Sequence, residues 1–284
     1  MTPGHLGTSG MAITADASDR IAFAKDRLSG ATRTNVIDRW IYVFTAASFI
    51  AIVLAGFVPN SFAKVAAINA GHRPPFPLVL HVHAVLMGSF LLLLLGQTIL
   101  VATGRRAWHM QLGVAAMVLV PVIVITGFIL VPTIYHSFWN AAQAAPPPAR
   151  QQLRGVLPIL DNILLVQIRA GILFSIYMWI ALWSRTRDPG LHKRMILLAV
   201  TAVLGAAIDR IDWLPSTMPG SPLAMDLFTL LAFCPMLIWD LVRNRGIHRA
   251  YLIWAGFYLP VSAVVYAIWD TPLWHATARN IMGV

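Results

Sequence analysis

Long apolar stretches separated by short polar segments dominate the chain from residue 40 onward. The windows lie at about residues 40–59, 77–103, 110–133, 157–183, 194–212, 222–242 and 250–270. Each comes close to or exceeds the ~20 residues that an α-helix needs to cross a ~30 Å hydrocarbon layer, and none alternates with the period of a barrel strand. Because lipid offers no water to backbone groups, such windows must be helical. The pattern predicts an all-α, polytopic bundle of seven transmembrane helices.

The first 39 residues have a different composition. They are rich in Gly, Ser, Thr, Ala and charged residues, and they contain no apolar core of a signal peptide. We therefore expect residues 1–39 to form an N-terminal tail and residues 40–284 to form a single transmembrane domain.

Composition and charge narrow the class of partner. The chain is 58% hydrophobic and 11% charged, with a mean hydropathy of +0.72, whereas soluble domains are about 25% charged. The net charge of +10 comes from short basic clusters between spans, which is typical of loops that face anionic lipid. We expect contact with the lipid bilayer and none with nucleic acid. The single cysteine, Cys234, excludes a disulfide framework.

The distribution of basic residues predicts an orientation. Most of the 21 Lys and Arg residues lie in the tail and in the loops on the same side of the spans. The positive-inside rule then places the N-terminus of this multi-pass membrane protein in the cytoplasm and the C-terminus outside. The longest connection, from about Pro132 to Pro158, contains three consecutive prolines and predicts an extended segment or a short lid outside the membrane.

Ionisable side chains inside spans are costly, so they mark candidate sites. His81 and His83 lie two residues apart near the outer end of the second span. This spacing turns them about 200° apart on a helix, so they face different neighbours. They suit two separate ligations, or one ligand beside one structural histidine. The alternative is a pair of partly solvated interfacial side chains.

Two further histidines begin spans on the inner side. His109 follows Arg105 and opens the third span, and His192 opens the fifth. Histidines among cations at a helix start are often interfacial groups. However, the third and fifth spans run in the same direction, so these imidazoles lie at equal depth. They are candidate ligands of one iron if the two spans also lie near one another.

The outer half of the bundle carries the remaining ionisable candidates. Asp161 lies in the fourth span, Asp226 opens the sixth and Arg210 closes the fifth, which predicts a polar cluster near His83. Arg169 lies near mid-membrane, where an unpaired guanidinium costs at least ~2.5 kcal/mol. It therefore needs a partner, for which Asp161, Asp226 or a ligand carboxylate are the candidates.

The chain from Arg39 onward resembles a group of uncharacterised proteobacterial seven-span membrane proteins. The shared motifs are His81-Val-His83, the segment 100–113 with its Gly-Arg and His, and the His-Lys-Arg-Met run of 192–199. The resemblance brings no activity, but it implies that the histidines have a role.

Two better understood families resemble fragments of the chain. The segment 81–88 looks like the HxH helix of haem-copper oxidase subunit I, in which one histidine ligates each of two haems. The pairing of His109 with His192 is similar to bis-histidine ligation in cytochrome b561. These resemblances imply haem b and a role in electron transfer, with arginines near the propionates. The cofactor-binding residues would be His81, His83, His109, His192, Arg105, Arg169 and Arg210.

Two other classes of function remain open, and so does whether the protein is an enzyme. Resemblance to the seven-span ceramidase and adiponectin-receptor group implies a metal-dependent intramembrane hydrolase, with zinc held by His81, His83, Asp161 or Asp226. The third class is a transporter, receptor or accessory subunit without a cofactor. Across these hypotheses the expected partners are other membrane subunits or a quinone-type redox partner.

Overall fold

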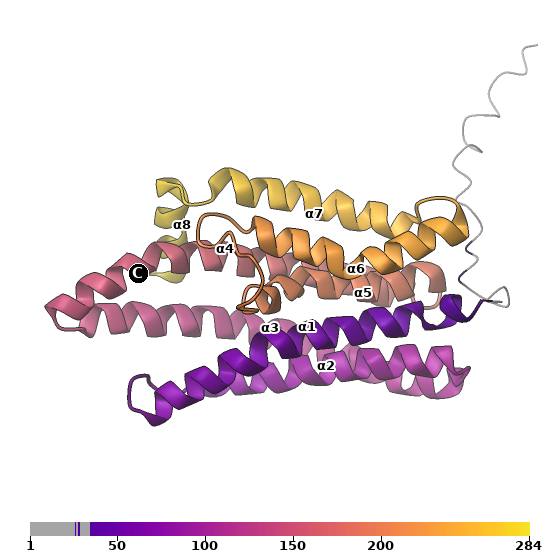
Figure 1. The fold of residues 1–284 in the computed structure, drawn as a ribbon, viewed down its shortest axis with the longest axis horizontal. Coiled ribbons are helices and arrows are strands. Elements are labelled where there is room, and N and C mark those ends of the chain that lie inside the picture. The colour runs from indigo at the N-terminus through magenta and orange to yellow at the C-terminus, as the bar shows by residue number, and fades with distance from the viewer. Residues whose placement is uncertain (1–25, 27, 29–34) are drawn as a thin grey trace, which may run out of the picture.

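The computed structural model describes residues 26, 28 and 35–284 (Figure 1). Within them, seven helices are long and apolar enough to cross a membrane, so the predicted all-α bundle is confirmed. They are α1 (Val36–Asn69), α2 (Leu78–Ala102), α3 (Arg106–Ala144), α4 (Pro147–Ser184), α5 (Pro189–Ile208), α6 (Leu223–Asn244) and α7 (Arg249–Ile268). Most of the predicted tail lies outside the described residues, and α1 already begins inside it.

Two parts of the chain differ from the prediction. The proline-rich connection is neither an extended segment nor a lid, because α3 continues to Ala144 and α4 begins at Pro147. Proline is favoured at the first helical position, where its missing N–H leaves no bond unmade and its φ suits the helix. An additional helix, α8 (Pro272–Met282), follows α7. At 11 residues it is too short to span a membrane, and the sequence analysis did not predict it.

The helix α5 lies at the centre of the bundle. It packs against α1, α4, α6 and α7, while α1 to α5 form a ring in which each helix packs on the next and α5 closes on α1. In Figure 1, α1 and α2 run along one edge of the molecule and α7 along the other. Gly56 of α1 lies directly against the carbonyl of Ala207 in α5. Only a residue without a side chain allows this close approach.

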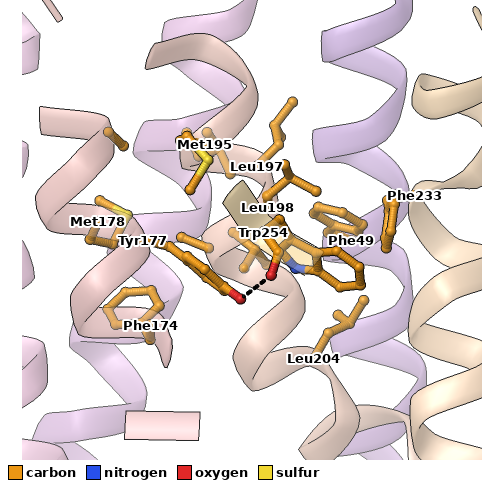
Figure 2. Close-up of a cluster of buried hydrophobic side chains, with 14 of the residues drawn as sticks. Phe49, Phe174, Tyr177, Met178, Met195, Leu197, Leu198, Leu204, Phe233 and Trp254 are labelled. Carbon is orange, nitrogen blue, oxygen red and sulfur yellow. Dashed lines mark hydrogen bonds between the residues drawn. The ribbon is translucent and has the colours of Figure 1, made fainter. Parts of the chain in front are cut away.

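The core around α5 is apolar, and polar groups within it form hydrogen bonds between helices. Phe49, Tyr177, Leu198 and Trp254 from four helices pack together there (Figure 2). The Tyr177 hydroxyl donates to the Trp254 carbonyl at 2.8 Å, and Trp254 Nε1 donates to Thr201 Oγ1 at 3.0 Å. Such satisfied bonds hold α4, α5 and α7 in one arrangement, because an unpaired polar group in the interior is costly.

Candidate functional site

A bidentate ion pair joins α4 to α6 inside the bundle. Arg169 donates to both oxygens of Asp226, from Nη1 to Oδ2 at 2.9 Å and from Nη2 to Oδ1 at 2.7 Å. Nη1 also donates to Ser262 Oγ of α7 at 3.2 Å. The two charged side chains are only 7% and 11% exposed. Among the partners that the sequence left open for Arg169, the structure selects Asp226.

Two tyrosines of α7 complete the surroundings of Asp226. The Tyr258 hydroxyl donates to Oδ1 and the Tyr266 hydroxyl donates to Oδ2, both at 2.9 Å. The guanidinium of Arg169 also lies over the Tyr258 ring, 5.5 Å from its centroid. The carboxylate therefore receives two donors on each oxygen, and these bonds are charge-assisted. This arrangement engages both charged groups in the pair and leaves neither for a metal or a propionate.

Asp161 of α4 is enclosed by α3 and α8. Its side chain is fully buried, the Tyr135 hydroxyl donates to Oδ1 at 2.6 Å, and His275 Nδ1 lies 3.0 Å from Oδ2. Trp274 Nε1 donates to the Asp161 carbonyl at 2.9 Å. His275 and Trp274 belong to α8, so sequence reasoning missed both. The available signal was Pro272 at the first helical position, directly after the last span.

His275 bridges two carboxylates at this end of the bundle. Its Nε2 lies 3.2 Å from Asp270 Oδ1, on the side opposite to Asp161. Asn162 holds Asp270 through two bonds, by donating to Oδ1 at 3.0 Å and by accepting from the backbone N–H at 3.2 Å. Asp161 and Asp226, which were predicted to share one polar cluster, therefore lie in two separate networks.

The two histidines of the HxH motif have different surroundings. His83 Nδ1 lies 3.0 Å from Thr126 Oγ1 of α3, and the Thr126 hydroxyl donates to the Ile123 carbonyl at 3.0 Å. Because that hydroxyl already donates its proton, Oγ1 accepts from Nδ1–H, and His83 Nε2 carries the lone pair. His81 is exposed and its ring meets the ring of Phe76 edge-on, with centroids 6.0 Å apart. The different neighbours agree with the 200° separation.

The residues proposed for zinc are not gathered in one place. Within residues 26, 28 and 35–284, no group of three or more His, Cys, Asp or Glu side chains is arranged to hold a metal ion. His81 is exposed, and His83 bonds to α3. Asp161 and Asp226 are each enclosed by donors of their own network.

His192 is oriented by a main-chain carbonyl. Its Nδ1 lies 2.7 Å from the Ala181 oxygen near the end of α4. A carbonyl oxygen only accepts, so the proton of the neutral ring is on Nδ1 and the lone pair is on Nε2. Histidines that ligate metals commonly have this arrangement, because the bond at one nitrogen fixes the tautomer of the other.

His109 is held by an amide from α2. In the orientation that satisfies its neighbours, Gln97 donates to His109 Nδ1 and, at 3.0 Å, to the His109 carbonyl, and it accepts from the Gly113 N–H at 3.1 Å. Gln97 thus bonds across one turn of α3. In this orientation His109 Nδ1 is an acceptor, and the ring proton is on Nε2. A half-turn of the amide would place Oε1 on Nδ1 and reverse the tautomer.

His109 and His192 are close enough to interact electrostatically, although α3 and α5 each pack on α4 rather than extensively on one another. Arg106 interacts with His109, and Arg185 interacts with His192. The bond of His192 to the main chain and the contact of the Gln97 amide with the His109 ring both use Nδ1, not Nε2. Arg105 is exposed beside them, at the start of α3. These residues define the inner histidine site.

Another polar network lies beside this site. Arg194, two residues after His192, is completely buried and pairs with Asp240 of α6 at 2.5 Å and with Asp26 at 3.0 Å. The Tyr251 hydroxyl donates to Asp240 at 2.6 Å. Sequence reasoning did not single out Asp240, because an acid near the end of a span is common at the interface. The network anchors the start of α5, and hence the His192 ring.

Arg210 lies at the opposite end of the bundle from His192. Its guanidinium lies over the Phe57 ring of α1, 4.9 Å from the centroid, and donates to the Ala206 carbonyl. Burial lowers the pKa of Arg210, and the charge of neighbouring Asp209 partly offsets this lowering.

Comparison of the chain with protein-family models, with curated proteins and with solved structures finds no match. What the protein does must therefore follow from the chemistry of its own residues. Of the predicted site residues, the structure brings together His109 and His192, with arginines beside them.

Proposed function

We propose that this protein is a membrane b-type haem protein that takes part in electron transfer, and that His109 and His192 would hold the haem iron. The observation that carries the proposal is the bond from His192 Nδ1 to the Ala181 carbonyl. It leaves an unused Nε2 lone pair near a second imidazole. Haem b, when bound, supplies a reversible one-electron centre.

The surroundings of His192 fit such a group as the ring stands, and those of His109 fit it after one change of a neighbouring side chain. His192 already has the tautomer that ligation needs, because Nδ1 donates to the main chain. His109 would acquire it if the Gln97 amide turned so that Oε1 accepted from Nδ1–H, a turn that gives up the bonds of Gln97 to the His109 carbonyl and to the Gly113 N–H. Arg106 and Arg185 lie near the two rings and offer guanidinium groups for the propionates. Gln97 is therefore a positioning residue for His109.

We further propose that the N-terminus is cytoplasmic and the C-terminus lies outside, in a bacterial inner membrane. The basic residues beside the inner histidine site, Arg105 and Arg185 among them, support this orientation through the positive-inside rule. The site then opens toward the cytoplasmic leaflet, where a quinone-type redox partner or another membrane subunit would reach it.

The two other functions have less support. For a zinc hydrolase, the candidate ligands lie apart in the described residues. For a transporter, receptor or accessory subunit, the buried charges of Arg169 and Asp226 satisfy one another, so no buried charge of that network is left to bind a substrate. These remain alternatives that the following experiment separates from the haem proposal.

The experiment is the visible spectrum of the purified protein and of three variants. We expect a low-spin haem b spectrum from the wild type, and its loss in His192→Ala and in His109→Ala. His248→Ser is the matched control, because His248 also lies at a helix start, where its Nδ1 accepts from the Ala250 N–H and serine supplies an equivalent cap. An unchanged low-spin spectrum in both alanine variants would contradict the ligand assignment.

A further inference from the structure

Three basic side chains gather at the end of the bundle opposite the inner histidine site. Lys64 lies near the end of α1, Arg73 lies in the connection to α2, and Arg210 follows α5. Lys64 interacts electrostatically with both arginines. No carboxylate of the described residues forms an ion pair with any of the three, and the acid that acts on Arg210 is Asp209. Burial raises the pKa of Asp209, and neighbouring Arg210 opposes that shift.

Aromatic rings hold both guanidinium groups in place. Arg210 lies over Phe57 at 4.9 Å, and Arg73 lies over Phe76 at 5.3 Å from the ring centroid. Such cation–π contacts restrain the arginine without using its N–H donors. An arginine side chain that is already held in place loses little conformational entropy when a ligand binds its N–H groups.

The backbone explains why the cluster forms here. Phe57 and Lys64 are seven residues apart on α1, so they lie on one face of the helix. The contact between Gly56, one residue before Phe57, and Ala207 brings the end of α5 against this part of α1, and Arg210 lies over the Phe57 ring. The close approach of α1 and α5 therefore assembles like charges that repel one another. Their repulsion costs stability unless an anion lies between them.

We propose that Lys64, Arg73 and Arg210 form a binding site for a phosphate group. Three cations from three segments suit an anion with several oxygens and more charge than one carboxylate, and planar guanidinium forks match phosphate oxygens. The cluster lies at the end of the spans, where lipid headgroups reside. The group comes either from an anionic phospholipid or from free phosphate, and the two sources share this chemistry.

The test uses the full chain, purified in a neutral detergent, and follows its thermal unfolding temperature. Phosphatidylglycerol, phosphatidylcholine and inorganic phosphate are titrated separately at constant ionic strength. The variants are Arg210→Gln and the triple exchange of Lys64, Arg73 and Arg210 to Gln. Arg154→Gln is the matched control, because Arg154 is an exposed arginine near the start of α4 at the same end.

We expect phosphatidylglycerol or phosphate to raise the unfolding temperature of the wild type and of the control. Half-saturation should weaken about tenfold in Arg210→Gln, the loss of one charge-assisted contact, and the response should vanish in the triple variant. A response to phosphatidylglycerol alone assigns the lipid headgroup as the source, and a response to both assigns the phosphate group itself.

Folding of the variants is checked without ligand. Lys64→Gln should unfold at or above the wild-type temperature, since it relieves repulsion between like charges. The proposal is overturned if the wild type responds to neither anion. It is also overturned if the triple variant responds as strongly as Arg154→Gln.

Discussion

Replacing Arg169 with leucine tests the ion pair inside the bundle. The substitution removes three hydrogen bonds, two to Asp226 and one to Ser262. Removing one partner of a buried pair costs about 3–5 kcal/mol. We expect about 3 kcal/mol, at the low end of the range, because Tyr258 and Tyr266 still donate to the carboxylate and because Asp226 can take up a proton.

The assay is equilibrium unfolding of the purified protein in detergent micelles. The double variant Arg169→Leu/Asp226→Leu should recover most of the lost stability, because no buried charge is then stranded. Arg154→Leu, at an exposed arginine, should change the free energy of unfolding by less than about 0.5 kcal/mol. Wild-type stability in Arg169→Leu, or additive losses in the double variant, would refute the buried-pair interpretation.

Three further predictions concern packing, pH and orientation. Gly56→Ala should destabilise the fold, because its Cβ would meet the Ala207 carbonyl, whereas Gly96→Ala has open space and should be neutral or raise the melting temperature. Burial, with neighbouring cations, lowers the pKa of His248 to about 4, so its contribution to stability should be lost as pH falls from about 6.5 toward 4. His248→Ser should flatten that part of a melting-temperature profile, and an equally steep profile would contradict the assignment. In a background without the native cysteine, Arg150→Cys should react with an impermeant thiol reagent from outside only, and labelling from the cytoplasm would reverse the orientation.

The spans could be predicted because hydrophobic length is a property of local sequence. The helix ends could not, since they depend on contacts beyond the lipid. The sequence analysis ended the third span near Pro132, but α3 continues to Ala144 because proline inside a long packed helix is tolerated. It also gave no weight to α8, whose residues are stabilised by Asp161 of a distant helix.

For the site residues too, position along a helix could be predicted from the sequence but contacts between helices could not. Because His109 and His192 both open spans that run in the same direction, the sequence predicted that they lie at equal depth. In the structure the two rings are close enough to interact electrostatically. Partner choice between helices has no local periodicity, so the sequence left Arg169 with three candidate partners. Asp240 was overlooked as the partner of Arg194 for the same reason. The amide of Gln97 on α2 likewise bonds to His109 on α3, a contact between helices that local periodicity does not predict.

The central claim is that His109 and His192 hold a haem, and the haem content of the purified protein tests it most directly. The protein is produced in haem-replete cells, purified in detergent, and assayed by its pyridine haemochrome spectrum against protein concentration. The account predicts about one haem b per chain, lost in His192→Ala and retained in His248→Ser. Wild-type protein that is folded but contains no haem would contradict it.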